Sequence, residues 1–391
     1  MTSYRYPCTG YIDLKGFGQF LEDETRSPRY NINAFTNELK ERFQAPFLTL
    51  VNSGSSANLV AALVLAEKIR KAGLPMTAAV SAFTFPTTIS SLALAGFEIR
   101  IVDTEEGGFN ISLKALEEME RENALPTVVA ATHFLGFPMK VREIADLVHR
   151  HGGFLLQDGC ETLHMETDGA LAFEYGDIFT WSFYHPHHLS AYGGGGIITL
   201  NQDDYLLVDS TAHWGRSCKC HVDHALCQVP EGPAHQFTYE RLGVNVEISE
   251  LNACFGRWQL RRWDEFEEKR LRNYQILYDE LRDADHLRVW KTPNVNGSAF
   301  VFPVQLTDGR TIDDAYRILV AEGVEIRALM GGVSNEQQAF VSLLGSEVQP
   351  HAHEMAKTTF FVGIHQTLPE EDVRTVAKKL KERLSSNNSS Q

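Results

Sequence analysis

The sequence predicts an α/β protein built on a mostly parallel β-sheet, followed by a smaller α+β domain. Between residues 47 and 200, short apolar segments alternate with amphipathic ones, a pattern typical of strands buried beneath helices on both faces. After Pro293 the pattern changes to a strand-like SAFVFPVQL, a helix and a last helix from Pro369. A chain of 391 residues is long enough to form both domains.

Apolar runs of strand length follow one another in the first half of the chain. They are 78–81, 99–102, 127–131, 154–157, 178–182 and 196–200. Helical stretches between them include 55–71, which begins at small hydroxyl residues and ends before Gly73, as well as 113–121 and 141–150. A long helical segment then runs from Ser249 to about Leu281.

These elements predict a division into two domains. We expect a large domain at 1–270, which includes an N-terminal arm and a cysteine-bearing loop, and a small domain at 271–384. The tail 385–391 reads SSNNSSQ and is expected to be flexible.

The charge and hydropathy of the chain exclude several kinds of partner. A formal net charge of −15 disfavours nucleic acid and anionic membrane surfaces, although a local pocket can still attract an anionic small molecule. No apolar run approaches membrane-spanning length, and the N-terminus has no apolar signal core. We therefore expect a cytoplasmic enzyme that binds neither nucleic acid nor a membrane.

Two motifs follow predicted strands at the sheet edge where α/β proteins bind ligands. In VNSGSSAN, the helix start at Gly54, Ser55 and Ser56 offers unpaired N–H groups to a phosphate, although the same residues also make an ordinary capping turn. In SAFTFPT, Phe85 can stack on a flat ring, unless both phenylalanines belong to the core.

Two more motifs carry polar side chains to the same edge. Asp158 ends the strand in FLLQDGCETL, where a buried carboxylate suits a protonated ring nitrogen or caps a helix. The loop SFYHPHHLSAYGGGG contains three histidines and four glycines. Glycines allow close approach of the backbone to a ligand, and imidazoles act as bases or metal ligands.

In order and spacing, these motifs resemble the DegT/StrS family of sugar aminotransferases and related dehydratases. The matching segments are SGSSAN, SAFTFPTT, THFLGFP, QDGCETLH, SFYHPHHLSAYGGGG and LGVNVEISEL, with a weaker match in FFVGIHQTLPEEDV. The resemblance covers roughly the first two thirds of the chain. It implies the pyridoxal-phosphate fold type I, with a seven-stranded sheet in the large domain, and a homodimer that shares its active sites.

The resemblance also implies which residues bind the phosphate of the coenzyme. Gly54, Ser55, Ser56 and Ser182 would hold it within one subunit. Asn245, in the GVN turn, would reach the phosphate in the other subunit.

The coenzyme ring would meet a second set of residues. Phe85 would stack on the ring, Asp158 would pair with its nitrogen, and Glu161 would lie near its hydroxyl, as in the dehydratase branch. The family's coenzyme-binding lysine falls on His187, which is followed by His188. Imidazole forms no imine, so the coenzyme would be bound non-covalently. His187 would then act as a base at its C4′ carbon, with His188 as a further catalytic residue.

A histidine pair at this position resembles the dehydratases that remove the C3 hydroxyl from an NDP-4-keto-6-deoxyhexose in deoxysugar biosynthesis. One branch of these lyases uses pyridoxamine 5′-phosphate, a [2Fe–2S] cluster and an electron-donating reductase, whereas the other uses glutamate. The cysteines Cys160, Cys218, Cys220 and Cys227 resemble the cluster ligands of the first branch. We therefore expect pyridoxal or pyridoxamine phosphate, a [2Fe–2S] cluster and a nucleotide-linked keto sugar.

Two alternatives remain open. The cysteines together with His221 or His224 would also make a tetrahedral zinc site, in a non-catalytic binding protein on the same scaffold. The chain could also be another coenzyme- and cluster-dependent enzyme that eliminates from, or transfers an amine to, a different carbonyl compound. Two departures from the family pattern favour a carbonyl substrate other than a nucleotide sugar. Glu247 stands where the family usually has a basic residue, and its negative charge would oppose a diphosphate. Gly193 stands where the family usually has an acidic residue.

Overall fold

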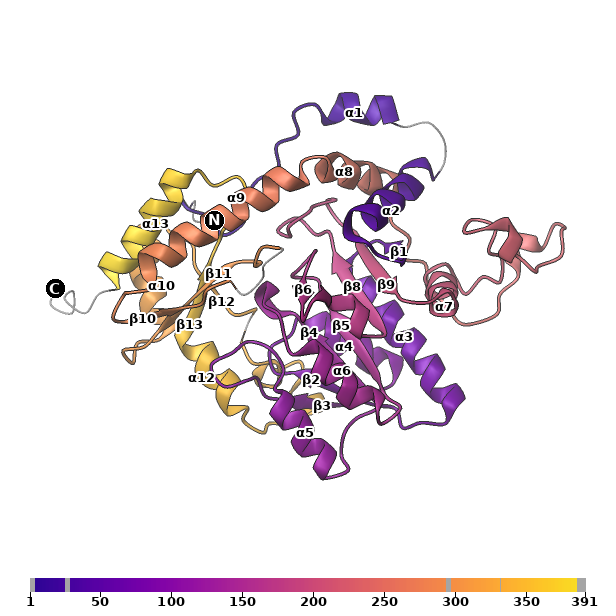
Figure 1. The fold of residues 1–391 in the computed structure, drawn as a ribbon, viewed down its shortest axis with the longest axis horizontal. Helices are drawn as coiled ribbons and strands as arrows, with labels where there is room; N and C mark the ends of the chain where they lie inside the picture. The colour runs from indigo at the N-terminus through magenta and orange to yellow at the C-terminus, as the bar shows by residue number, and fades with distance from the viewer. Residues whose placement is uncertain (1–3, 25–28, 293–296, 331, 385–391) are drawn as a thin grey trace.

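A computed structural model describes residues 4–24, 29–292, 297–330 and 332–384 (Figure 1). The tail predicted at 385–391 lies outside these residues. At the centre is a seven-stranded sheet in the order β1-β9-β8-β5-β4-β2-β3. The strands are β1 (Phe47–Val51), β2 (Thr77–Ser81), β3 (Glu98–Val102), β4 (Val128–Thr132), β5 (Phe154–Asp158), β8 (Ile178–Ser182) and β9 (Gly195–Thr199).

The sheet is mostly parallel, as predicted. Only β9 is antiparallel to its neighbours, β1 and β8. Each predicted strand is confirmed to within one residue at either end. The short hairpin of β6 (Glu166–Thr167) and β7 (Ala170–Leu171) lies outside this sheet.

Helices cover both faces of the sheet, because successive strand residues point to opposite sides. On β4, Val128 and Ala130 pack with α3 (Gly54–Ala72) and α4 (Pro86–Ala95). Val129 and Ala131 pack on the other face with α5 (Leu113–Arg121) and α6 (Val141–His149). All five residues of β4 are buried, which explains why the first four, Val128 to Ala131, are apolar without a break.

The remaining helices frame the sheet and connect it to the small domain. They are α1 (Phe17–Glu24), α2 (Tyr30–Phe43), α7 (Gln202–Ala212), α8 (Glu250–Leu260) and α9 (Trp263–Leu281). The single helical segment expected at 249–281 is thus two helices, which meet at Arg261 and Arg262. Helix α9 runs through the boundary expected between residues 270 and 271, and that domain division stays a prediction.

The small domain contains a four-stranded antiparallel sheet in the order β10-β11-β13-β12. Its strands are β10 (Leu287–Val289), β11 (Phe302–Leu306), β12 (Arg327–Ala328) and β13 (Thr359–Val362). Its helices are α10 (Ile312–Ala321), α11 (Val341–Leu344), α12 (Pro350–Thr358) and α13 (Glu370–Arg383). Helix α9 packs against α13 and β10 (Figure 1).

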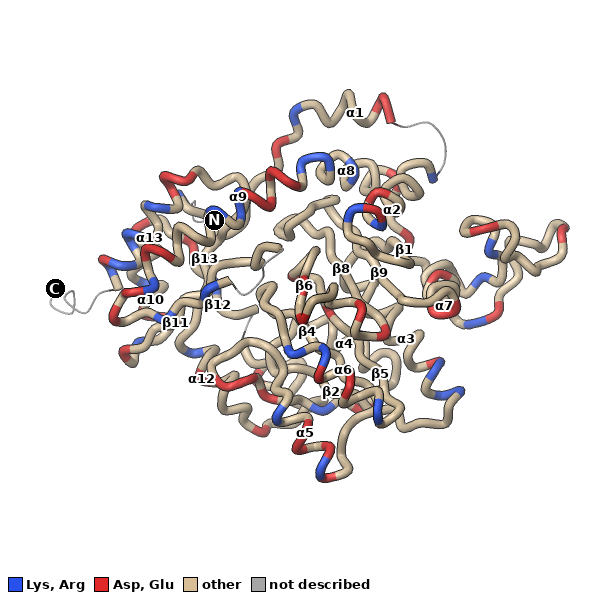
Figure 2. Tube along the Cα trace, in the orientation of Figure 1, with Lys and Arg blue, Asp and Glu red and all other residues tan. Residues whose placement is uncertain are grey.

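Charged residues lie mainly on the outer helices and on the loop that projects beyond α7, whereas the central strands carry few (Figure 2). This loop joins α7 to α8 and extends away from the body of the molecule (Figure 1). Within the described part of the chain, every helix is too short or too polar to cross a membrane.

Candidate active site and metal centre

A cavity of about 770 Å³ opens where β5 and β8 end and α3 begins. Most of the side chains predicted to bind the coenzyme line it: Gly54, Ser55, Phe85, Asp158, Glu161, Ser182 and His187. The predicted residues Ser56, His188 and Asn245 do not line it. Among the described residues that line the cavity there is no lysine.

One end of the cavity has the chemistry of an anion site. Helix α3 begins at Gly54, and its first N–H groups and positive dipole end face the end of β8. A Cβ atom on Gly54 would lie 2.7 Å from Ser182 Cβ and 2.8 Å from Cys160 Sγ, so only glycine fits here. The backbone N–H of Ser56 instead donates to Ser53 Oγ at 3.0 Å, which caps the helix.

Asp158 is buried at the centre of the cavity floor. Its Oδ2 accepts hydrogen bonds from Asn58 Nδ2 at 2.9 Å and from Thr88 Oγ1, and its Oδ1 accepts one from the Cys160 N–H at 3.1 Å. Within the described chain Asp158 has no ion pair with a basic side chain. A buried carboxylate that faces a cavity without a cationic partner suits a protonated ring nitrogen.

The two phenylalanines of SAFTFPT have different environments. Phe83 is fully buried and stacks on Phe134, with ring centroids 5.2 Å apart. Phe85 is 49% exposed and lines the cavity, where its face is available to a flat ligand. Phe83 therefore belongs to the core, whereas Phe85 does not.

Glu161 lies against the same cavity with its carboxyl group largely removed from water. Burial raises the pKa of Glu161 to about 8, although the backbone N–H of Leu135 donates to Oε2. At neutral pH this carboxyl group is therefore mainly protonated and can donate a hydrogen bond to a ligand oxygen.

The two histidines that follow Pro186 point in different directions. His187 lines the cavity, its ring stacks on Phe300 with centroids 5.0 Å apart, and its buried Nδ1 has no hydrogen-bond partner in the described chain. Burial, aided by Arg270, lowers the pKa of His187 to about 3, so the imidazole is neutral. His188 is buried behind the cavity wall, with Nε2 2.9 Å from the carbonyl oxygen of Ser298.

Arg270 is a cavity residue that the sequence analysis missed. Its guanidinium is buried and donates to Ser298 Oγ and to the carbonyl oxygens of Ala299 and Phe300. Arg270 thereby orients the backbone of Phe300, whose ring stacks on His187. A signal existed in the sequence, because Arg270 lies four residues from both Phe266 and Tyr274 on the buried stripe of α9.

Three of the four predicted cluster ligands come together in the projecting loop, and Cys160 does not join them. The sulfur atoms of Cys218, Cys220 and Cys227 and a ring nitrogen of His235 all lie within 4.8 Å of one another. Cys160 lies instead in the wall of the cavity, beside Gly54. A [2Fe–2S] cluster on four cysteines therefore does not fit the donor set that the described residues assemble.

The zinc alternative also named the wrong histidines. His221 Nε2 lies 2.9 Å from Asp209 Oδ2, and His224 belongs to an exposed turn. His235 had no distinguishing signal beyond its place in the same loop, eight residues after Cys227.

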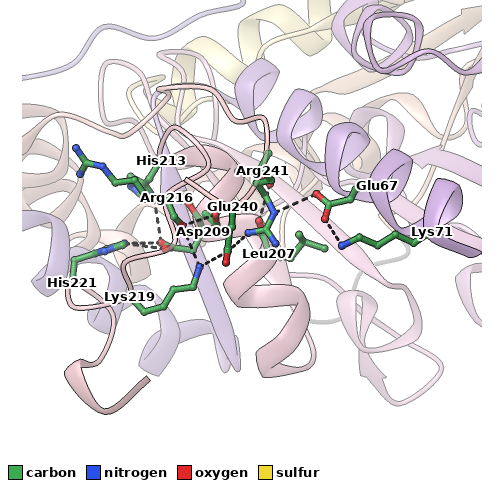
Figure 3. Close-up of polar contacts among 12 residues, drawn as sticks. Glu67, Lys71, Leu207, Asp209, His213, Arg216, Lys219, His221, Glu240 and Arg241 are labelled. Carbon is green, nitrogen blue, oxygen red and sulfur yellow. Dashed lines mark hydrogen bonds and ion pairs between the residues drawn. The ribbon is translucent and has the colours of Figure 1, made fainter. Parts of the chain in front are cut away.

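Charged side chains at the base of this loop form two groups of ion pairs, one around Asp209 and the other around Glu240 (Figure 3). Asp209 lies between His213, with Oδ1 to Nδ1 at 3.2 Å, and His221. The other ring nitrogen of His213 is 3.4 Å from Glu247, which also pairs with Arg29. Burial would raise the pKa of Glu247, but His213 and Arg29 outweigh it and lower that pKa. The negative charge of Glu247 is thus balanced by two neighbours.

Comparisons with known proteins show the family of this chain. The model of the DegT/DnrJ/EryC1/StrS aminotransferase family matches residues 15–381. The chain belongs to this family. Membership confirms the resemblance that the motifs predicted, and the solved structures of family members confirm fold type I.

Members of the family similar to this chain include two sugar dehydratases. The dTDP-4-dehydro-2,6-dideoxy-D-glucose 3-dehydratase of Saccharopolyspora spinosa is 28% identical over 373 residues, which cover 90% of this chain and 80% of that protein. The GDP-4-keto-6-deoxy-D-mannose 3-dehydratase of Yersinia pseudotuberculosis is 27% identical over 381 residues, covering 94% and 95%. A crystal structure of GDP-4-keto-6-deoxymannose-3-dehydratase with a trapped PLP-glutamate geminal diamine has a TM-score of 0.83 and 22% identity, covering 96% and 100%.

Proposed function

We propose that this protein is a pyridoxamine-phosphate-dependent 3-dehydratase of nucleotide-linked 4-keto-6-deoxyhexoses, with His187 as its base. One observation carries the proposal. The cavity combines an anion site at Gly54 and a buried Asp158 with a neutral imidazole, and no lysine lines it in the described chain. A coenzyme held there has no amine to bind it covalently, which excludes the usual lysine-dependent transamination cycle.

The residues fit the coenzyme in four places. The N-terminus of α3 and Ser182 suit its phosphate, Phe85 suits the face of its ring, and Asp158 suits the ring nitrogen. Glu161, which carries a proton at neutral pH, can donate a hydrogen bond to the ring hydroxyl.

When bound, pyridoxamine phosphate supplies an amine that condenses with the substrate ketone and a ring that stores electrons. His187 is neutral, so it can take the proton from the C4′ carbon through Nδ1 and return it to the C3 hydroxyl as that group leaves as water. Stacking on Phe300 fixes the plane of the imidazole, and the hydrogen bond from Arg270 to its carbonyl oxygen fixes the position of Phe300. His188 acts as a positioning residue through the carbonyl of Ser298.

The amino group consumed in this reaction must be restored. Since the donor set in the loop does not fit a [2Fe–2S] cluster, we propose an amino donor such as glutamate in place of the reductase expected from the sequence. The solved relative that contains glutamate with its PLP supports this choice. Nitrogen then leaves as ammonia in each cycle, and the donor leaves as a 2-oxo acid.

The names of the relatives and the residues near the cavity support a substrate class and an oligomeric state. The names of the two dehydratase relatives support a nucleotide-linked sugar, and the pairing of Glu247 with Arg29 and His213 removes the objection to a diphosphate. Asn245 is exposed and lies off the cavity of its own chain. This supports a homodimer in which Asn245 reaches the phosphate site of the partner.

The test is to incubate the protein with pyridoxamine phosphate, glutamate and either dTDP- or GDP-linked 4-keto-6-deoxyhexose, and to follow the sugar by mass spectrometry. We expect a product that has lost one oxygen atom, and deuterium from the solvent should enter the C4′ position. His187→Asn should abolish this exchange while the coenzyme still binds. Full exchange in His187→Asn would remove His187 from the mechanism.

A lysine variant provides the matched control. His187→Lys returns an amine to the cavity, so borohydride should attach pyridoxal phosphate to this variant and not to the wild type. Attachment to the wild-type protein would mean that another amine reaches the coenzyme, which would overturn the non-covalent site.

A further inference from the structure

The sulfur and nitrogen atoms in the projecting loop are arranged at the spacing of a single metal ion. His235 Nε2 lies 3.1 Å from Cys218 Sγ, 3.2 Å from Cys220 Sγ and 3.5 Å from Cys227 Sγ. Around one tetrahedral zinc ion, bond lengths of about 2.0 Å to nitrogen and about 2.3 Å to sulfur place such atoms about 3.5 Å apart. The observed distances are therefore close to the edges of one tetrahedron.

A binuclear cluster requires a different spacing. In a [2Fe–2S] cluster two ligands bind each iron, so His235 would share its iron with one cysteine only. The other two sulfur atoms would lie across the sulfide-bridged iron pair, more than about 5 Å away. All four donor atoms here lie within 4.8 Å of one another, and His235 contacts all three sulfur atoms.

A backbone carbonyl group orients the imidazole of His235 toward the three cysteines. His235 Nδ1 lies 3.1 Å from the carbonyl oxygen of Pro230, which fixes the tautomer whose Nε2 lone pair faces the cysteines.

In the described chain, the loop is held by contacts at its base and by local hydrogen bonds, without a hydrophobic core. Residues 214–243 contribute nothing to the hydrophobic clusters of the described chain, and they form only the short turns η3 (His224–Leu226) and η4 (His235–Phe237). Its ends are joined by an Arg216–Tyr239 bridge, and Lys219 pairs with Glu240 near its base (Figure 3). A segment of this length without a core needs a cross-link near its tip.

We propose that Cys218, Cys220, Cys227 and His235 bind one Zn²⁺ ion that holds this loop folded, and that Cys160 is not a ligand. Three thiolates and one imidazole in a tetrahedron are a donor set that zinc prefers in structural sites. This site does not depend on the proposed dehydratase reaction, because it lies outside the coenzyme cavity.

The first experiment uses the wild-type protein. The protein is purified anaerobically from cells grown in a medium that contains both zinc and iron. Elemental analysis should then find about one zinc ion per chain. Iron and acid-labile sulfide should be absent, and dithionite should bleach no visible band. Replacement of zinc by Co²⁺ should produce the intense visible bands of a tetrahedral sulfur-rich site. Iron with an equal amount of sulfide, or the weak bands of octahedral Co²⁺, would overturn the proposal.

Variants then identify the fourth ligand. His235→Ala should release its metal to a chromophoric chelator at least about tenfold faster than the wild type. His224→Ala, in the same loop but outside the donor set, and Cys160→Ser should both behave like the wild type. If Cys160→Ser loses metal as readily as His235→Ala, the assigned ligand set is wrong. Because Cys160→Ser leaves the loop intact, its result stands even if His235→Ala fails to fold.

Discussion

The ion pairs around His213 predict how the stability of the protein changes with pH. Burial alone would lower the pKa of His213, but Asp209 and Glu247 outweigh it and raise the pKa to about 9. In the unfolded chain the value is about 6.5. Because the folded pKa is the higher one, the stabilisation is complete below pH 6.5 and is lost as the pH rises through 9. The gap between the two values corresponds to about 3 kcal/mol.

His213→Gln removes the charge and keeps a side chain that can form hydrogen bonds. At pH 6.5 the variant should melt about 4 °C below the wild type, the shift that 3 kcal/mol produces in a chain of this length. At pH 9.5 the two proteins should melt at nearly the same temperature. Scanning calorimetry at both values measures the difference, and His151→Gln, an exposed residue paired with Glu120, is the control. A gap in melting temperature that is equal at both pH values would refute an ionised His213.

Three further predictions concern the cavity. Gly54→Ala should weaken pyridoxamine phosphate binding at least about tenfold in a fluorescence titration, because its methyl group enters the anion site; Gly18→Ala, with nothing within 4 Å, should have no effect. Phe83→Ala should lower the free energy of unfolding by about 3–5 kcal/mol, whereas Phe85→Ala should mainly weaken coenzyme binding, by about 1 kcal/mol. Denaturant titrations in which Phe85→Ala loses more unfolding free energy than Phe83→Ala would contradict the assignment of the two residues. Glu161→Gln should raise the melting temperature at pH 8.5. The raised pKa of Glu161, about 8, makes the wild type less stable as the pH rises from about 4.5 to 8. A melting temperature of the variant no higher than that of the wild type at pH 8.5 would refute the buried proton.

The strands of the large domain were predictable because each carries its own signal. β4 is buried on both faces, so its first four residues are all apolar and only Thr132 at its end is polar. The break between α8 and α9 was missed, since Arg261 and Arg262 are good helix formers and only the packing of the two helices makes them separate.

Part of the cavity could also be placed from the sequence. Parallel strands end at the same edge of a sheet, so Asp158 and Ser182, at the ends of β5 and β8, had to lie near the helix start at Gly54. The sequence could not decide which phenylalanine of SAFTFPT faces the ligand. Both follow the same strand, and burial against Phe134 distinguishes them only in three dimensions.

By itself the sequence determined the family and the order of the strands along the chain. It also predicted that His187 replaces the coenzyme lysine. The tertiary structure alone decided that Arg270 supports the cavity from α9 and that Arg29 and His213 balance the charge of Glu247. It also decided that a ring nitrogen of His235, and not the sulfur atom of Cys160, lies beside the other three cysteines. The reason is physical. Periodicity and motif spacing describe neighbours along one element, whereas charge pairs and ligand sets are formed by groups that loop closure brings together from distant positions.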